Sequence, residues 1–172
     1  MEARMEIRNL SPKDYQPIIS VVNNWWGERN MSSMLPKLFF VHFRNTSFIA
    51  QLDNKIIGFL IGFLSQTYPQ QAYIHFVGIH PDFRNQGIGR AMYQKFFHTV
   101  KQFGCCQVKC VTSPLNKNSI AYHLHMGFEI EPGEAQQEGI PYHPNYDGAQ
   151  EDRVLFVKQL SKNQGFKTPT DG

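Results

Sequence analysis

Long apolar runs, cysteines and an excess of one charge sign are all scarce or missing in this 172-residue sequence. No stretch approaches the roughly 20 apolar residues of a membrane span, and the amino-terminal MEARMEIRNL lacks the apolar segment of a secretory signal. The three cysteines, Cys105, Cys106 and Cys110, make a poor disulfide framework, and no second ligand cluster follows to complete a zinc site. We therefore expect a cytoplasmic protein with no membrane partner and no metal, whose cysteines pack as small apolar residues on a buried strand.

The charge balance is only mildly basic, because 17 Lys and Arg against 14 Asp and Glu give a net charge of +3. Without a basic stripe or a nucleic-acid-binding module, this balance gives no reason to expect a nucleic-acid partner. With 41% hydrophobic residues, the chain can bury a sizeable core. The length predicts a single domain over residues 1–160, and the polar residues 161–172 predict a frayed C-terminal tail.

The hydrophobic periodicity alternates along the chain between helical and strand-like. Strands are predicted at residues 5–10, 47–52, 56–65, 72–79, 107–112, 128–131 and 154–160. Helices are predicted from Ser11 and Pro12 to Trp26, at about 31–43, at about 87–103 and at 117–126, with a long loop before the last strand. Hairpins followed by alternating strands and helices indicate an α/β (α+β) domain, with helices on both faces of a sheet.

The segment from Val77 to Arg90 carries the most informative motif, since it lies between a predicted strand and a predicted helix. Gly87 and Gly89 allow the backbone to approach a ligand closely, and free N–H groups at a helix start favour a phosphate. A dinucleotide fingerprint is excluded because Met92 stands where it needs glycine, and no Gly-Lys-Ser/Thr P-loop is present. The motif predicts a pyrophosphate site, with an ordinary glycine turn as the alternative.

The pattern Arg84-x-x-Gly87-x-Gly89 after an apolar strand resembles the acetyl-coenzyme A signature of the GNAT superfamily of N-acetyltransferases. A second block, from Asn116 to Phe128, is similar to that family's Asn-x-x-Ala/Ser…Gly-Phe segment. The resemblance implies a GNAT-like mixed, mostly antiparallel twisted sheet flanked by helices on both faces. It also implies transfer of acetyl from acetyl-CoA to a primary amine, by direct attack in a ternary complex.

The resemblance further implies which residues bind the cosubstrate. Backbone amides at the start of the helix predicted at about 87–103 would hold the pyrophosphate, namely those of Gln86, Gly87, Ile88, Gly89 and Arg90, with Arg84 as part of the signature. The main chain of Val77 and Ile79, beside a bulge expected at Gly78, would pair with the pantetheine arm. Asn116 would bond the same arm, and it is also a natural helix N-cap.

His75 is the candidate general base. An alkylammonium with a pKa near 10.4 must lose a proton before it can attack, and a histidine with a pKa of about 6.5 suits that task. One branch of the family has a histidine at this spacing, whereas others have a glutamate two residues earlier, where this chain has Tyr73. Strand periodicity places Tyr73, His75 and Val77 on one face. The alternative for His75 is a structural histidine on a half-buried strand.

The general acid is open between two residues. The family commonly has a tyrosine four residues before the Gly127 position, where this chain has His123, and its tyrosine is Tyr122 instead. A shift of one residue turns a helical side chain by about 100°, so Tyr122 does not simply inherit the role. His123 donates only if it is protonated, and a thiolate with a pKa near 8.5 leaves tolerably well without help.

The distribution of charged residues along the chain bears on which kind of amine accepts the acetyl group. Residues 131–152 contain no Lys or Arg but hold six acids, Glu131, Glu134, Glu138, Asp147, Glu151 and Asp152. An acidic wall with Tyr142 and Tyr146 would favour a small cationic amine, and a solvated surface loop is the alternative. A protein or peptide amine, or a noncatalytic CoA-binding module, stays open as a rival function. A homodimer also stays open.

Overall fold

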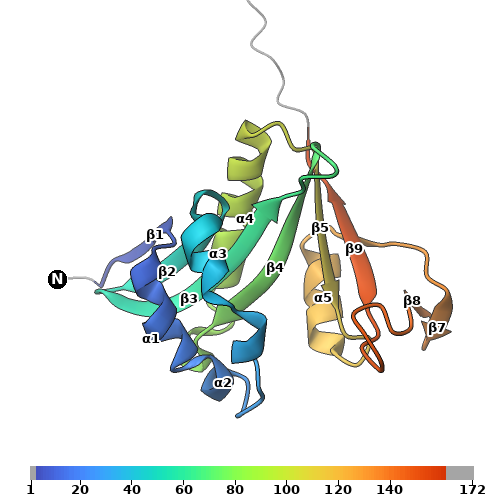
Figure 1. Ribbon diagram of the computed structural model, residues 1–172, viewed down its shortest axis with the longest axis horizontal. Coiled ribbons are helices and arrows are strands. Elements are labelled where there is room, and N and C mark those ends of the chain that lie inside the picture. Colours follow the sequence, from blue (N-terminus) through green and yellow to red (C-terminus); the bar gives the residue numbers. More distant parts are fainter. Residues whose placement is uncertain (1–2, 162–172) are drawn as a thin grey trace, which may run out of the picture.

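The computed structural model describes residues 3–161, which form a seven-stranded sheet covered by helices, together with a small separate hairpin (Figure 1). The order in the large sheet is β1-β2-β3-β4-β5-β9-β6, and all neighbours are antiparallel except β4 and β5. Its strands are β1 (Met5–Asn9), β2 (Phe48–Leu52), β3 (Lys55–Leu64), β4 (Gln71–Ile79), β5 (Gln107–Thr112), β6 (Glu129–Ile130) and β9 (Val154–Gln159). The predicted mixed, mostly antiparallel sheet is confirmed.

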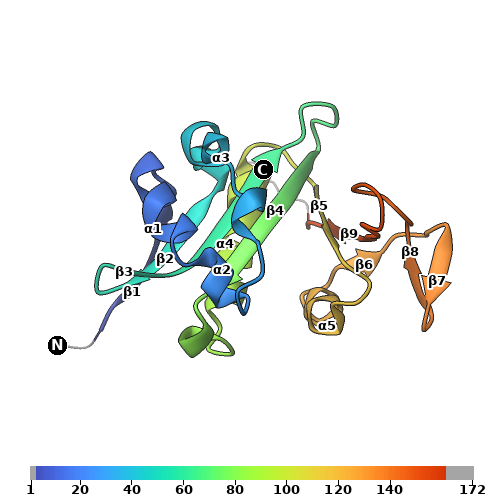
Figure 2. The ribbon, with the colours of Figure 1, turned by 60° about the horizontal axis from the view of Figure 1, so that its bottom comes forward.

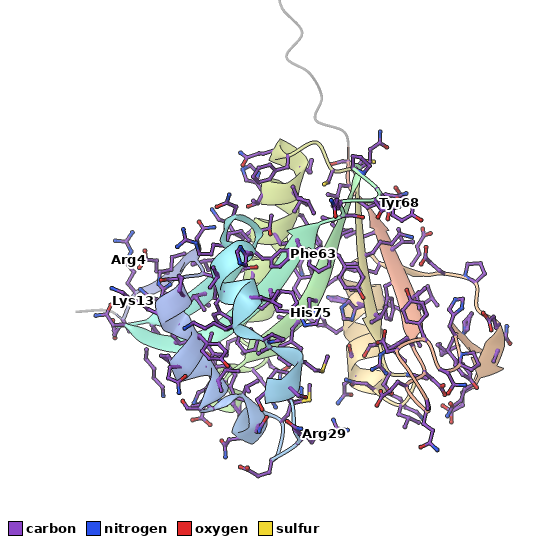
Figure 3. All side chains as sticks on the ribbon, in the orientation of Figure 1. Arg4, Lys13, Arg29, Phe63, Tyr68 and His75 are labelled. Carbon is purple, nitrogen blue, oxygen red and sulfur yellow. The ribbon has the colours of Figure 1, made fainter. Side chains whose placement is uncertain are left out.

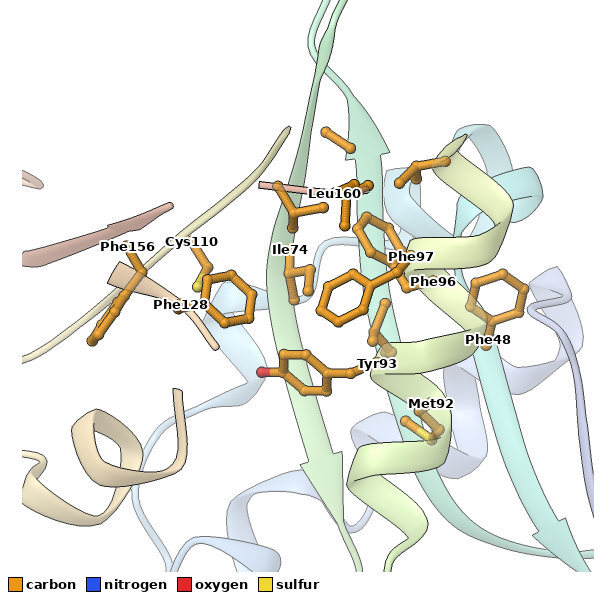
Figure 4. Close-up of a cluster of buried hydrophobic side chains, with 14 of the residues drawn as sticks. Phe48, Ile74, Met92, Tyr93, Phe96, Phe97, Cys110, Phe128, Phe156 and Leu160 are labelled. Carbon is orange, nitrogen blue, oxygen red and sulfur yellow. The ribbon is translucent and has the colours of Figure 1, made fainter. Parts of the chain in front are cut away.

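Helices cover both faces of this sheet, as predicted. Helices α1 (Tyr15–Ile19), α2 (Val22–Trp25) and α3 (Lys37–His42) lie on one face, and α4 (Ile88–Gln102) and α5 (Lys117–His125) lie on the other (Figures 1 and 2). Each face has its own core. Phe40, Phe59 and Phe76 belong to the core under α1–α3, whereas Phe96 and Phe156 belong to the core under α4 and α5 (Figure 4). No helix within residues 3–161 is long and apolar enough to cross a membrane.

The two N-terminal helices are shorter and more broken than predicted. Ser11 caps the start, as expected, but the first turn is a 3₁₀ helix (Pro12–Asp14), and the Ser20 hydroxyl donates to the Pro17 carbonyl where α1 ends. The second predicted helix begins only at Lys37, because Pro36 restricts Leu35 to a non-helical backbone with φ −123° and ψ 62°. A separate 3₁₀ turn (Ser32–Met34) takes its place upstream.

The long loop predicted after residue 131 contains a hairpin that the prediction missed. Strands β7 (Ala135–Gln137) and β8 (Ile140–Tyr142) pair around Glu138 and Gly139, whose φ angles of 50° and 79° are both positive. Two positive φ values are typical of the tight turns that match strand twist. The predicted C-terminal tail, apart from Ser161, lies outside the described residues.

Candidate functional site

The sheet splits between β4 and β5. The two strands pair over three residues each, ending at Tyr73 and Lys109. From there β4 runs on to Ile79, and no strand within residues 3–161 pairs with it on that side. Figure 1 shows the strands diverging from this point. We call the gap the seam. Backbone N–H and C=O groups along this edge of β4 need partners, so the edge suits an extended ligand that carries amides.

A β-bulge at His75 changes the direction of the side chains along β4. Phe76 pairs with Ile61 and Ile74 pairs with Gly62, which leaves His75 as the extra residue. As a result, Val77 packs against the α4-side core, whereas the His75 ring packs on the α3 side. The prediction that Tyr73, His75 and Val77 share one face was therefore wrong, and so was the expected bulge at Gly78.

Gly78 is needed for a different reason than a bulge. A Cβ atom at this position would lie 2.5 Å from the Phe59 ring and 2.7 Å from the Trp26 ring, closer than side chains tolerate. The glycine therefore allows α2 and the aromatic core to pack directly against β4, next to the seam.

The loop from Asn85 to Arg90 forms a backbone cradle at the start of α4. Asn85 and Gly87 adopt positive φ angles of 60° and 81°. None of the backbone N–H groups from residue 85 to residue 90 donates to a partner within residues 3–161, and the first helical bond is from Ala91 to the Gly87 carbonyl. Consecutive free N–H groups at a helix start make a concave anion site, so this cradle fits a pyrophosphate.

Arg84 is not part of the cradle through its side chain. Its guanidinium donates from Nη2 to the Trp25 carbonyl and from Nε to the Ile79 carbonyl, at 2.5 and 3.2 Å. These bonds turn the charge toward the carboxyl end of α2. The structure thus gives Arg84 the task of fixing the loop against α2, rather than of presenting charge to an anion.

Asn116 occupies the N-cap position of α5. Its side-chain oxygen accepts the Ser119 N–H at 3.1 Å, which is the capping role that the sequence offered as one alternative. The side-chain NH2 has no partner among the described residues, so Asn116 can cap the helix and still donate to a ligand.

His75 is held in one orientation on the α3 side of β4. Its Nε2 lies 2.6 Å from the Met34 carbonyl oxygen, and its ring stacks on Phe39 with centroids 4.5 Å apart. Because a carbonyl only accepts, Nε2 carries the proton and the lone pair is on Nδ1. Nearby, Tyr73 stacks on Phe63, and burial raises the pKa of the Tyr73 hydroxyl well above 10, so this residue stays protonated.

His123 does not fit the predicted role of general acid. It is only 7% exposed, its Nδ1–H donates to the Ser119 carbonyl at 2.7 Å, and its Nε2 accepts from the Tyr93 hydroxyl at 3.0 Å. Burial lowers the pKa of His123, so the ring is neutral and its one proton is already engaged. Figure 4 shows the Tyr93 hydroxyl pointing away from α4, toward the half of the sheet that holds Phe128. The pair therefore ties α4 to α5 across the seam.

Tyr122, the other candidate acid, lies beside the cradle. A Cβ atom on Gly89 would come within 3.1 Å of the Tyr122 hydroxyl. Burial raises the pKa of Tyr122, and the charge of Arg90 opposes that shift. The hydroxyl is thus positioned near the pyrophosphate end of the site.

The acidic segment is not the free anionic wall that the sequence suggested. Arg153 pairs with Asp147 at 2.6 Å and with Glu151 at 2.9 Å. Lys109 pairs with Glu131, and Lys117 pairs with Glu138 at 2.8 Å. Four of the six carboxylates are therefore engaged in ion pairs, with Lys109, Lys117 and the directly following Arg153. Three cations do not neutralise six acids, so the segment keeps a net negative charge.

Comparisons with known proteins agree with this geometry. A model of the acetyltransferase (GNAT) family matches residues 5–128. The L-2,4-diaminobutyric acid acetyltransferase of Nocardia farcinica is 33% identical over 79 residues, which are 46% of this chain and 41% of that protein, so the match spans about two fifths of the relative's length.

Two solved structures share the fold. Ard1 from Thermoplasma volcanium superposes with a TM-score of 0.73 at 18% identity, covering 91% of this chain and 98% of that one. The diaminobutyrate acetyltransferase EctA from Paenibacillus lautus, in complex with its substrate L-2,4-diaminobutyric acid and coenzyme A, gives 0.69 at 21% identity, covering 92% and 96%. At these identities the likeness concerns the fold alone.

Proposed function

Since the chain belongs to the acetyltransferase (GNAT) family, we propose that it transfers acetyl from acetyl-CoA to the primary amine of a small molecule, by direct attack in a ternary complex. The observation that carries the proposal is the combination of an open seam with an unpaired N–H cradle at its end. The Nocardia relative, named for a small diamine acid, supports a small amine as acceptor.

The residues present fit the cosubstrate along its length. The cradle amides of Gln86, Gly87, Ile88, Gly89 and Arg90 bind the pyrophosphate. The free edge of β4, at Val77 and Ile79, pairs with the amides of the pantetheine arm, and Asn116 donates to the arm from the other side of the seam. When bound, acetyl-CoA supplies an activated thioester.

His75 removes the proton that blocks attack. Its Nδ1 lone pair accepts a proton from the alkylammonium, directly or through one water, and the Nε2–H to the Met34 carbonyl stabilises the imidazolium that results. The amine nitrogen then bonds to the acetyl carbon, and the carbon–sulfur bond breaks with its electron pair on sulfur. The acylated nitrogen loses its second proton to solvent, which leaves a neutral amide.

The leaving group needs no acid from His123. A thiolate with a pKa near 8.5 is stable enough to depart near neutral pH and take its proton from water. This assignment leaves His123 and Tyr93 as a structural tie between α4 and α5.

Turnover over a panel of amines tests the proposal. The full chain is mixed with acetyl-CoA and with small monoamines, diamines, amino sugars and peptides, and free thiol is measured. Binding of coenzyme A is followed separately by calorimetry. Release of thiol that depends on a small amine supports the proposal. Peptides as the sole acceptors support a peptide N-acetyltransferase, and coenzyme binding without turnover supports a noncatalytic module.

A further inference from the structure

Tyr73 is a largely buried titratable residue to which the proposed function gives no task. It lies where the pairing of β4 with β5 ends, opposite Lys109, and its ring stacks on Phe63 with centroids 5.3 Å apart. The Tyr73 hydroxyl has no hydrogen-bond partner within residues 3–161, yet no fully buried polar side-chain atom described there lacks one. The hydroxyl oxygen is therefore accessible, and it is free to bond to a ligand at this end of the seam.

Tyr73 lies on the same side of the sheet as the candidate base. Ile74 belongs to the core under α4, so strand alternation points Tyr73 to the α3 side, where His75 packs on Phe39. Figure 3 shows His75 and Phe63, the ring partner of Tyr73, together next to α3. Two residues of strand advance about 6.6 Å, and the bulge at His75 shortens that advance. Two hydrogen bonds to one nitrogen span about 5.8 Å, so one amine can bond to both side chains.

The chemistry of the attack requires a second partner for the amine. The N–H bond that breaks points toward Nδ1 of His75, so the lone pair that remains on nitrogen points there too, and not at the acetyl carbon. The nitrogen must therefore turn about its bond to carbon before it can attack. A second group that holds one of the remaining N–H bonds fixes the turned orientation. A hydroxyl oxygen suits this task, because it accepts hydrogen bonds through two lone pairs.

Tyr73 is suited to accept a hydrogen bond and unsuited to act as a second base. Burial raises the pKa of its hydroxyl, the charge of Asp147 raises this pKa further, and the charge of Arg153 lowers it. The hydroxyl therefore keeps its own proton near neutral pH. Its task differs from that of His75, which takes up a proton in every turnover.

We infer that Tyr73 is a catalytic residue that orients the acceptor amine, with its hydroxyl oxygen accepting one N–H of the amine once His75 has removed the blocking proton. This bond aims the nitrogen lone pair at the acetyl carbon. No proton moves to or from Tyr73. The proton removed first is on His75, and the second leaves for solvent after the new carbon–nitrogen bond has formed. The inference rests on the proposed function and adds a residue to it.

Tyr73→Phe tests the inference, because it keeps the ring on Phe63 and removes only the hydroxyl. With the full chain, acetyl-CoA and the small amine of the panel that gives the highest kcat/KM, the variant is expected to lower kcat/KM by about 10–10²-fold. The pH dependence separates the two roles. The deficit of His75→Ala is expected to shrink from pH 7 to about pH 10, because more of the amine arrives deprotonated. The deficit of Tyr73→Phe is expected to persist, because a deprotonated amine still has to be oriented.

Calorimetry gives a second readout that does not depend on turnover. The same amine is titrated into the complex with coenzyme A, where no acetyl group can be transferred. Tyr73→Phe is expected to weaken amine binding about fivefold, the worth of one hydrogen bond, and to leave coenzyme A affinity unchanged. The matched control is Tyr68→Phe, at a residue that is 60% exposed, which is expected to change neither the rate nor the binding.

Three results overturn the inference and leave the proposed function intact. They are a normal rate with normal amine binding in Tyr73→Phe, a deficit that shrinks with pH as in His75→Ala, and a loss of coenzyme A affinity as large as the loss of rate. Peptides as the sole acceptors overturn the small-molecule acceptor, and the same variants are then compared with the peptide. Coenzyme binding with no turnover of any amine overturns both proposals.

Discussion

The Nε2 atom of His75 lies 2.6 Å from the carbonyl oxygen of Met34, and this contact decides which nitrogen of the ring can accept a proton. Met34 belongs to the 3₁₀ turn that precedes α3, so the N-terminal helical region orients a side chain that protrudes from β4 at a bulge. The Met34 carbonyl accepts the proton on Nε2 and stays in place when Nδ1 takes up a proton, as suits a histidine that acts as a base.

Replacing His75 tests its role as base. His75→Ala is expected to lower kcat/KM by about 10²–10⁴-fold while leaving coenzyme affinity nearly intact. The deficit is expected to shrink as pH rises, because more of the amine arrives deprotonated. Steady-state rates across pH measure this. His75→Gln is the matched control, since it can still donate to Met34 but cannot take up a proton. A near-normal rate with an unchanged pH profile would return His75 to a structural role.

The cradle is tested at Gly89, where a side chain can be added without the positive φ that complicates Gly87. Gly89→Val is expected to weaken acetyl-CoA binding at least tenfold, about 1.4 kcal/mol, because the added methyl groups enter the space in front of the free amides. Calorimetry measures the affinity. Gly89→Val combined with Tyr122→Phe removes the hydroxyl that the new Cβ would meet at 3.1 Å. Unchanged affinity would place the pyrophosphate elsewhere.

The tie between Tyr93 and His123 is expected to stabilise the fold. Tyr93→Phe leaves Nε2 of His123 without its hydrogen-bond partner, and His123→Phe leaves the Tyr93 hydroxyl without its partner. The double variant removes both groups. The two changes are therefore expected to couple by about 1 kcal/mol in the free energy of unfolding. Chemical denaturation measures the double-mutant cycle. Tyr68→Phe, at a residue that is 60% exposed, replaces Tyr93→Phe in a control cycle with His123→Phe, and the effects of these two changes are expected to add. Strict additivity in the first cycle would contradict the bond.

Stability is also expected to depend on pH through His123. Burial lowers its pKa in the folded state below the value of about 6.5 that applies when the chain is unfolded. Between the two values the unfolded chain binds the proton and the folded chain does not, so stability is full above about pH 6.5 and is lost as pH falls through the folded pKa. NMR titration of the ring in the native protein locates that pKa directly. His123→Phe should flatten the acid limb, and a ring that titrates near 6.5 would refute the argument.

The strands of the sheet could be predicted from the sequence, because the apolar pattern of a strand is local to that strand. The strand predicted at residues 107–112 matches β5 residue for residue. The N-terminal helices were overpredicted because apolar spacing alone ignores Pro36 and the side chain of Ser20. The bulge at His75 was out of reach, since it is a property of the pairing between β4 and β3 rather than of either strand.

The candidate site likewise has one part that could be predicted from the sequence and another that could not. The cradle was predictable because a glycine-rich turn into a helix is local. The stacking of Phe39 on His75 and of Phe63 on Tyr73 was not predictable, because these residues come from three separate elements. The ion pairs of the acidic segment could not be predicted for the same reason, since Lys109 and Lys117 lie outside it.

Because β4 and β5 pair over only three residues each, the rest of this edge of β4 is free to pair with a bound ligand. A bound chain that hydrogen-bonds along the free edge of β4 would act as a temporary eighth strand, so ligand binding and folding share the same free energy. The two halves of the sheet meet at three residues of β4, at the Tyr93–His123 bond and in the shared core around Phe97 and Phe128, and they would then move as one body. Amide exchange from Phe76 to Ile79 should slow as the cosubstrate saturates the protein, and the melting temperature should rise with its concentration.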